Sequence, residues 1–373
     1  MKIVVASDSF KGSMTSLEVA ASARLGILSV CPDYEVVAVN VADGGEGTVD
    51  AIVGALKGTI VNCVVSDPLG RPIQASYGIA GDTAVLEMAA ASGLPLLHVD
   101  ERNPWVTSTF GTGEMIMDAI ARGCRKFLVG IGGSATNDAG MGMLQAMGFR
   151  FYDTNNELIT RGSGGVLGTI ARIDDSLVST AVKESVFIVA CDVDTPFCGP
   201  NGAAPVFAPQ KGADVDMVSL LDDGMASFAR VIEKKYAVNV VSVAGAGAAG
   251  GMGGAFLAFL SATLKKGVDM VLDAIDFDTT ITGADLIITG EGKIDFQTAK
   301  GKTAAGVLSR AKKQHIPVVA IGGCVEMCDS LSKLGFAGIY PILEEKVPLE
   351  VAMQREFAMN NVQKTITRIL KFL

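Results

Sequence analysis

Short apolar runs rich in β-branched residues alternate with helical segments at both ends of this 373-residue chain. Near the N-terminus they predict a strand at 2–6, a helix at 18–28 and a strand at 34–41. Near the C-terminus they predict strands at 284–290, 316–323 and 336–343, with a helix at 303–314. Strands joined through helices pair in parallel, because each helix returns the chain to the same end of the sheet. We therefore predict a parallel-sheet α/β domain built from both chain ends, residues 1–60 plus 281–373.

The middle of the chain, residues 61–280, follows a different pattern. Three strand-like runs, IVNCVVS, IQASYGI and TAVLEM, are separated by the short turns DPLGRP and AGD, which favours an antiparallel meander. Strands are also predicted at 126–131, 149–153, 185–193 and 237–244, and helices at 112–123 and 141–148. The fold class is therefore α/β with two domains, the second an inserted mixed α/β domain.

Charge and cysteine content exclude several classes of partner. The net charge of -9 is spread without long acidic or basic runs, which disfavours nucleic acid and anionic membranes. Residues 236–264 carry no charge, but six glycines interrupt them, so we predict buried elements and no transmembrane helix. The seven cysteines contain no CxxC pair, which favours reduced thiols and a cytoplasmic location.

Charged residues mixed with glycine follow several predicted strands. They occur in SDSFKGS (7–13), ADGGEGT (42–48), ACDVDTP (190–196) and TGEGKIDFQTAKGKT (289–303). Open α/β sheets bind ligands at the carboxyl ends of their strands. Phosphoryl transfer needs such a mixture, because lysines offset phosphate charge, carboxylates hold magnesium and one carboxylate accepts the hydroxyl proton. The alternative is that these charges are merely solvated loop residues.

These clusters give the candidate residues of a phosphoryl-transfer site. The candidate catalytic residues are Asp43, Asp192, Lys11 and Lys293. The candidate substrate-binding residues are Asp8, Ser9 and Lys11, together with Arg71 of the turn DPLGRP, which is a candidate anchor for a substrate carboxylate. The candidate metal ligands are Asp43, Asp192 and Asp295.

Two glycine-rich runs are candidate nucleotide loops. The run GIGGSATNDAGMGM (130–143) lies between a predicted strand and helix, where backbone amides can converge on an anion. The run GAGAAGGMGG (245–254) contains a GxGxxG pattern with Asp269 about twenty residues later, as in dinucleotide-binding folds. Glycines that only permit close packing are the alternative for both runs. The candidate nucleotide-binding residues are Gly132, Gly133, Ser134, Asn137, Gly247, Gly250 and Gly251.

Seven blocks of the chain together resemble the bacterial glycerate kinase family of the type that makes 2-phosphoglycerate. They are DSFKGS, ADGGEGT, DPLGRP, GIGGSATNDAGMG, VFAPQKGA, GAGAAGGMGG and ITGEGKID with QTAKGKT, and they span essentially the whole chain in order. The family pattern NDGGAG departs here at Ala139, where alanine restricts φ.

The resemblance implies ATP-dependent, Mg²⁺-assisted phosphorylation of D-glycerate to 2-phospho-D-glycerate by a two-domain α/β enzyme in the cytoplasm. It also implies that the parallel-sheet domain is flavodoxin- or Rossmann-like. The partners it implies are D-glycerate and ATP, and a homo-oligomer stays open. The GxGxxG run keeps one alternative, an NAD-dependent oxidoreductase acting on a small hydroxy acid.

Overall fold

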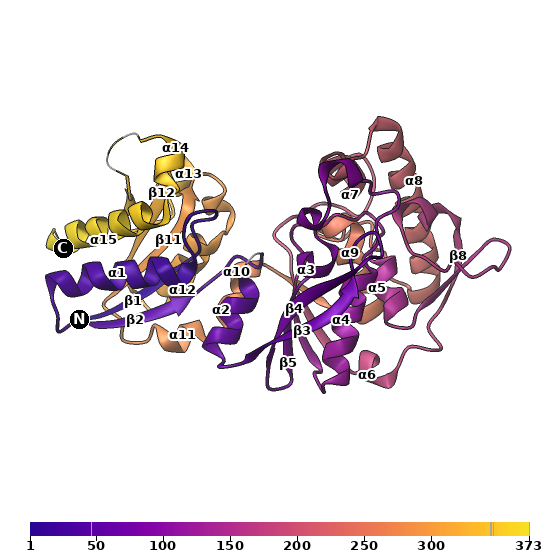
Figure 1. The fold of residues 1–373 in the computed structure, drawn as a ribbon, viewed down its shortest axis with the longest axis horizontal. Coiled ribbons are helices and arrows are strands. Elements are labelled where there is room, and N and C mark those ends of the chain that lie inside the picture. Colours follow the sequence, from indigo (N-terminus) through magenta and orange to yellow (C-terminus); the bar gives the residue numbers. More distant parts are fainter. Residues whose placement is uncertain (46, 344, 346, 373) are drawn as a thin grey trace. The chain divides into compact units, whose positions relative to one another are not determined.

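The computed structural model describes residues 1–45, 47–343, 345 and 347–372, and the chain divides into two compact units (Figure 1). Unit 1 contains Met1–Asp43, Asp50–Leu56 and Val268–Leu373. Unit 2 contains Gly44–Val49 and Lys57–Gly267. The second stretch of unit 2 thus ends at residue 267, whereas the sequence pattern put the end of the inserted domain at residue 280.

Unit 1 is built on a wholly parallel five-stranded sheet, which confirms the predicted fold class. The strand order is β13-β12-β11-β1-β2, so strands from both chain ends pair at its centre, with Val4 opposite Ile287. The central strands are buried on both faces, as expected for apolar, β-branched runs. The strands are β1 (Lys2–Ser7), β2 (Glu35–Asn40), β11 (Leu286–Ile294), β12 (Val318–Val325) and β13 (Gly338–Pro341).

Helices cover both faces of this sheet. The helices α1 and α15 lie side by side (Figure 1), and their apolar residues share one core with Ile3 and Val5 of β1. Helix α12 contacts β1, β11 and β12 from the other side. Helix α1 begins with a capping box, because Thr15 and Glu18 bond each other's backbone N–H groups. The helices are α1 (Ser16–Val30), α2 (Thr48–Ala55), α10 (Gly267–Ala274), α11 (Phe277–Thr280), α12 (Thr303–Lys313), α13 (Asp329–Ser332), α14 (Leu349–Ala352) and α15 (Arg355–Lys371), with a 3-10 turn at Thr298–Lys300.

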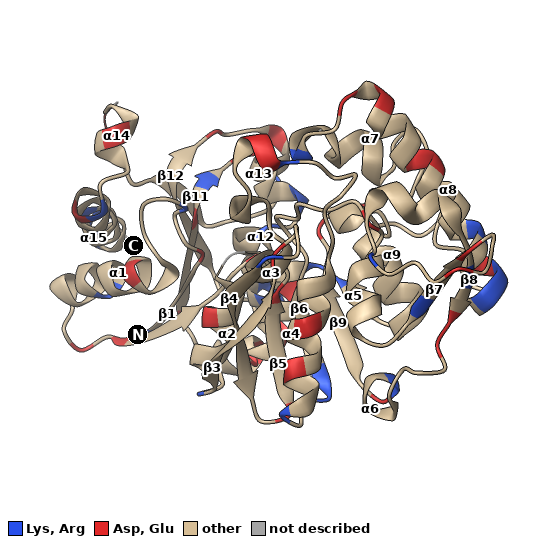
Figure 2. Ribbon diagram, turned by 45° about the vertical axis from the view of Figure 1, so that its right-hand side comes forward, with Lys and Arg blue, Asp and Glu red and all other residues tan. Residues whose placement is uncertain are grey.

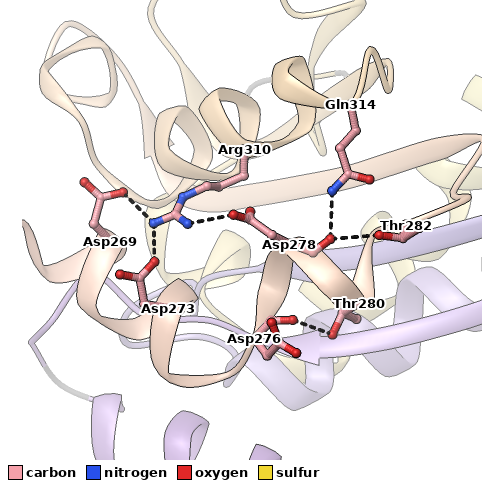
Figure 3. Close-up of polar contacts among 8 residues, drawn as sticks. All are labelled: Asp269, Asp273, Asp276, Asp278, Thr280, Thr282, Arg310 and Gln314. Carbon is pink, nitrogen blue, oxygen red and sulfur yellow. Dashed lines mark hydrogen bonds and ion pairs between the residues drawn. The ribbon is translucent and has the colours of Figure 1, made fainter.

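One arginine holds α10 and α11 to α12 in unit 1. The Arg310 guanidinium, mostly buried, lies 3.3 Å from Asp269, 2.5 Å from Asp273 and 3.0 Å from Asp278 (Figure 3). Gln314 adds a bond from its side-chain amide to the Asp278 carbonyl oxygen. These contacts are why residues 268–280 belong with unit 1. They also give Asp269 a structural partner in place of the ribose hydroxyl of a dinucleotide.

Unit 2 is built on a mixed six-stranded sheet of order β10-β9-β6-β5-β4-β3. The predicted meander is confirmed, since β3, β4 and β5 pair antiparallel, while β5, β6, β9 and β10 pair in parallel. Between β6 and β9 in the sequence, β7 and β8 form a separate two-stranded antiparallel ribbon. The strands are β3 (Thr59–Ser66), β4 (Pro72–Ala80), β5 (Thr83–Glu87), β6 (Lys126–Gly130), β7 (Arg150–Asp153), β8 (Ile170–Asp174), β9 (Val186–Ala190) and β10 (Thr263–Lys265).

The helices of unit 2 share one large apolar core with its sheet. No helix in the described ranges is long and apolar enough to cross a membrane. Figure 2 shows basic and acidic residues interspersed on both units. The helices are α3 (Ala89–Ser92), α4 (Phe110–Ala121), α5 (Met141–Ala146), α6 (Thr180–Lys183), α7 (Ala203–Phe207), α8 (Val215–Tyr236) and α9 (Ala248–Leu260), with 3-10 turns at Leu94–Leu96, Val99–Glu101, Gly164–Thr169 and Pro209–Lys211.

The strand predicted at 237–244 is wrong. Helix α8 ends in a left-handed residue, Ala237 (φ +55°), and the chain then forms turns. The Asn239 side chain accepts the backbone N–H of Val241, whose side chain is exposed. Asparagine favours such local bonds over a strand ladder, which outweighs the β-branched composition. The GxGxxG run therefore follows turns and not a strand, so it lacks the context of a dinucleotide fingerprint.

Candidate active site

A cavity of about 480 Å³ lies in unit 1 at the carboxyl ends of its strands. Strand order reverses between β1 and β11, because the chain continues from β1 to β2 on one side and from β11 to β13 on the other. Ligands of open α/β sheets bind at such a switch point. The polar residues that line the cavity are Asp8, Ser9, Lys11, Ser13, Asp43, Glu291, Lys293 and Lys302.

Asp8 is held rigidly just after β1. Its backbone N–H bonds the Gly290 carbonyl oxygen at 2.9 Å, which keeps the chain paired with β11. One carboxylate oxygen accepts the Ser9 N–H at 2.6 Å and the other accepts the Thr303 hydroxyl at 2.7 Å. Burial raises the pKa of Asp8, the charge of Asp43 raises it further, and the two hydrogen bonds partly offset this.

Glu291 is the strongly perturbed carboxylate of the cavity. It belongs to β11, is 6% exposed, and accepts a short hydrogen bond from the Thr298 hydroxyl. Burial raises its pKa to about 7, while Thr298 and Lys302 oppose that rise. A carboxyl group that titrates near neutral pH in a cavity is suited to proton transfer.

Lys11 and Asp43 come together across the ends of β1 and β2. Lys11 lies at the tip of a tight turn closed by a bridge between Phe10 and Met14, and its ammonium nitrogen is 3.8 Å from the Asp43 carboxylate. The lysine is 60% exposed and the aspartate 23% exposed, so this ion pair faces the open cavity. Such a solvated pair adds little stability, and Lys11 can therefore turn to an anionic ligand at small cost.

Lys293 and Asp295 lie further along the same strand end. The Lys293 ammonium is 2.9 Å from Glu326 and 3.5 Å from Asp295. Asp295 accepts the Gln297 N–H at 2.8 Å in a turn, and it does not line the cavity. Burial raises the pKa of Asp295, but the Gln297 hydrogen bond and Lys293 outweigh it and lower the pKa overall.

The other predicted ligands of a metal or substrate lie in unit 2. The Asp192 carboxylate accepts the Gly267 N–H at 3.0 Å, and its side chain is exposed. Arg71 is bound to Asp67 at 2.5 Å and to Glu101 at 2.6 Å, so its guanidinium braces the turn between β3 and β4. Over the described ranges, no three His, Cys, Asp or Glu side chains are grouped to hold a metal ion by themselves.

The run 130–143 is mostly buried in unit 2. Asp138 accepts four hydrogen bonds, from the N–H and hydroxyl of Thr109 and from the N–H groups of Gly140 and Gly142. Burial raises its pKa, and these donors oppose the rise. Asn137 is fully buried and donates to the Met225 sulfur. Asp138 thus joins the start of α4 to the start of α5, which is a structural role.

Within this run Ser134 is tied down by a buried lysine. The Lys211 ammonium, 1% exposed, donates to the Ser134 hydroxyl at 2.8 Å and to the Thr136 carbonyl oxygen at 2.7 Å. Burial lowers the pKa of Lys211 to about 7, and the charge of Asp138 opposes this. In the run itself, Gly132 and Gly133 alone are exposed, so they are the members that can approach a ligand.

The second glycine run packs against the first. A side chain at Gly250 would collide with the backbone of Thr136, and one at Gly247 with the Pro196 carbonyl oxygen. Gly251 is left-handed, with φ +92°, and a side chain there would press on the Ala139 backbone. Ala139 itself takes a left-handed φ of +50°. Close backbone packing is thus a sufficient reason for glycine at Gly247, Gly250 and Gly251, and the predicted nucleotide contacts of these residues stay predictions.

Three residues in or beside the cavity were not among the predicted site residues, and each had a signal in the sequence. Glu291 follows a predicted strand, but Gly290 and Gly292 suggested that the strand had ended. Lys302 and Thr303 stand at the start of a predicted helix, where side chains point back toward the preceding strand end. We expected strand 284–290, whereas β11 continues to Ile294 and carries Glu291 into the buried edge.

Comparison with known proteins agrees with this geometry. The sequence model of the glycerate kinase family matches residues 3–373. The chain is 47% identical over 357 residues to a glycerate kinase from Bacillus subtilis, covering 95% of this chain and 93% of that one. It is 48% identical over 325 residues to a glycerate 2-kinase from Escherichia coli, covering 87% and 85%.

The fold also has a close solved counterpart. A provisionally named glycerate kinase 2 from Salmonella typhimurium LT2 superposes with a TM-score of 0.91 at 41% identity, covering 100% of this chain and 98% of that one. These matches give no support to an oxidoreductase. With a family match over nearly its whole length and carboxylates and lysines gathered at the sheet's switch point, the chain belongs to the glycerate kinase family and is a kinase.

Proposed function

We propose that the protein transfers the terminal phosphoryl group of ATP to the 2-hydroxyl of D-glycerate, assisted by Mg²⁺, at the cavity of unit 1. The observation that carries the proposal is Glu291, a buried carboxylate with a pKa raised to about 7, in a cavity that also holds lysines. The Escherichia coli relative is named a glycerate 2-kinase, which supports the 2-hydroxyl as acceptor.

Glu291 is proposed as the general base. As the hydroxyl oxygen forms its bond to phosphorus, the bond from phosphorus to the ADP oxygen breaks, and the hydroxyl proton passes to Glu291. The Thr298 hydrogen bond fixes one carboxylate oxygen of Glu291 and so orients the other. A pKa near neutrality keeps a large fraction of the base ionised at working pH while leaving it basic enough to accept the proton.

Lysines are proposed to hold the anionic groups. Lys11 and Lys302 line the cavity beside the carboxylates, and Lys293 lines it from β11. Their charges offset the negative charge on the transferred phosphoryl oxygens and on the substrate carboxylate. Ser9, next to Asp8 in the same turn, is proposed to contact the substrate.

The donor set of the cavity fits a magnesium ion. Asp43 raises the pKa of both Asp8 and Glu291, so these carboxylates repel one another and a cation among them relieves that repulsion. Mg²⁺ is usually bound by one or two carboxylates plus substrate phosphates, so a complete protein cage is not required. We propose Asp43 and Asp8 as its protein ligands; when bound, Mg²⁺ neutralises charge on the phosphate oxygens. Asp192 and Asp295 stay predictions as further ligands.

The remaining predicted contacts lie in unit 2 and stay predictions. They are anion binding by Gly132, Gly133 and Ser134, nucleotide contacts by Asn137, Gly247, Gly250 and Gly251, and anchoring of glycerate by Arg71. A cytoplasmic location is supported by the seven cysteines, which are all free thiols.

A coupled ADP-release assay tests the proposal. We expect turnover that requires both D-glycerate and Mg²⁺, with L-glycerate a much poorer substrate. ³¹P and ¹H NMR of the product should give 2-phosphoglycerate. Formation of 3-phosphoglycerate would reject the 2-hydroxyl as the acceptor. ATP turnover at the same rate with and without glycerate would reject glycerate as the substrate.

Glu291→Gln tests the base in the same assay. We expect kcat to fall by about 10²–10⁴-fold, the usual contribution of a general base, with little change in KM for ATP. Glu350→Gln, the same change on an exposed side chain of α14, is the control. A Glu291→Gln enzyme that keeps the parent's kcat would remove Glu291 from the mechanism.

A further inference from the structure

The unit 1 cavity has two chemically different halves. Across the edge of the sheet, the ends of β11, β1 and β2 supply the charged residues, among them Glu291, Lys11 and Asp43. The ends of β12 and β13 and the start of α14 supply Gly323, Cys324 and apolar side chains. The apolar side chains that follow β13 and lie on or beside α14 are Ile342, Leu343, Val347, Leu349, Ala352 and Met353.

Glycerate cannot account for the apolar half. Each of its three carbons carries an oxygen, so it offers almost no apolar surface, and a cavity of about 480 Å³ is in the range of roughly 300–1,000 Å³ that holds larger ligands. Leu349 is 75% exposed and Met353 36% exposed, so apolar side chains stand at the surface beside the cavity. A flat ring system that is apolar on both faces would cover them.

We infer that the apolar half, between the ends of β12 and β13 and helix α14, is the site of the nucleotide's purine base. The inference rests on the proposed function in taking ATP as the phosphoryl donor, and it assigns the base to unit 1. The phosphates then point across the sheet edge toward β11 and β1, where Lys293, Lys302 and Lys11 lie.

The turn that carries Lys11 joins the two halves. A side chain at Gly12, which has φ +77°, would lie 2.8 Å from the Met353 methyl carbon, so the turn rests directly against the end of α14. Phe10, at the base of the same turn, also lines the cavity and is buried. A base seated against Met353 is thus one short turn away from the ammonium group that faces the phosphates.

Filling the apolar half tests this assignment. Ala352→Phe places a ring in the cavity, and Glu350→Phe places the same ring on the exposed side of α14 as the control. Calorimetric titration of the full-length protein should show ADP binding weakened at least tenfold by Ala352→Phe, with inorganic tripolyphosphate binding and the KM for glycerate changed less than threefold. Leu349→Ala, at a side chain that is 75% exposed, keeps the test valid if Ala352→Phe fails to fold, and should weaken ADP binding about threefold or more.

Photolabelling locates the base independently. With 8-azido-ATP we expect the cross-link within residues 334–355, and adenosine should compete with it. A cross-link within residues 127–150, around Gly132 and Gly133, would overturn the inference, as would a folded Ala352→Phe protein with unchanged ADP affinity.

The outcomes separate the inference from the proposed function. If ADP binding depends on Ala352 but no glycerate is phosphorylated, the purine site stands and the proposed function fails. If glycerate is phosphorylated normally and the ADP affinity is unchanged by Ala352→Phe, the proposed function stands and the purine site is wrong.

Discussion

Burial of Glu291 should lower the stability of the protein as the pH rises, and replacement of Glu291 by glutamine should remove this contribution. The pKa of Glu291 is raised from 4.5 to about 7, so the folded state holds this proton more tightly than the unfolded chain does. The stabilising effect of protonation is complete below about pH 4.5 and is lost as the pH rises through about 7. Glutamine keeps the acceptor for Thr298 and stays neutral at every pH.

The magnitude follows from the shift. At about 1.4 kcal/mol per pH unit the full effect is about 3 kcal/mol, of which about 2.5 kcal/mol falls between pH 5 and pH 8. The free energy of unfolding of Glu291→Gln, relative to that of the parent, should therefore rise by about this amount from pH 5 to pH 8. The difference rises with pH because an ionised carboxylate in this site costs free energy that a neutral amide does not.

Urea unfolding at a series of pH values, monitored by circular dichroism, measures this difference. Glu350→Gln makes the same chemical change at a side chain exposed in both folded and unfolded chains, so its difference from the parent should stay flat. A flat difference for Glu291→Gln as well would refute the reasoning, since Glu291 would then not be held in a site that disfavours its charge. A difference that falls with rising pH would refute it more strongly.

Four further substitutions test other contacts. Lys11→Ala and Asp43→Asn should each lower kcat/KM for glycerate at least tenfold in the steady-state assay, and values within a few-fold of the parent would take both residues out of the site. The pKa of Lys211 is lowered from 10.5 to about 7, so the unfolded chain holds that proton more tightly and the parent loses stability as the pH falls from about 10 to about 7. Lys211→Met lacks this proton, so its free energy of unfolding relative to that of the parent should rise over the same pH range. Urea midpoints measure this difference, and a difference that stays constant with pH would contradict it. Arg310→Ala should destabilise the fold by about 1–3 kcal/mol, because three carboxylates lose their common partner. That loss, read from urea midpoints, should shrink at high salt, and an unchanged midpoint would show that α10 and α11 are held by apolar packing alone.

The parallel sheet and the positions of its strand ends could be predicted because both depend on local pattern. Apolar β-branched runs, helices between them and charged residues after them are enough to place Asp8, Lys11 and Asp43 at one edge of the sheet. Their approach in space follows from strand order, since β1 and β2 are neighbours.

The burial of Glu291 could not be predicted in this way, because a glycine at the end of an apolar run can either begin a turn or allow close packing against a neighbouring strand. Gly290 suggested a turn, yet it permits close packing, since a side chain there would collide with the Ile321 carbonyl oxygen of the neighbouring strand β12. Only the partner strand distinguishes the two cases. The failed strand at 237–244 has the same origin, because composition does not reveal whether a neighbouring strand is present to pair with it.

The two kinds of glycine-rich loop in this protein also explain why glycine alone is a weak guide to a ligand site. In unit 2, Gly250 and Gly251 bring one backbone against another, and the only exposed part of the partner run is Gly132 with Gly133. In unit 1, Gly12 follows Lys11 and Gly292 stands between Glu291 and Lys293, so each glycine is next to a charged side chain that lines a cavity. Burying a charged side chain without a partner costs free energy, so a charged residue next to a glycine needs a reason of its own. Close packing of two backbones does not need such a charge. The neighbouring charge, more than the glycine itself, is therefore the sequence signal that points to the proposed active site.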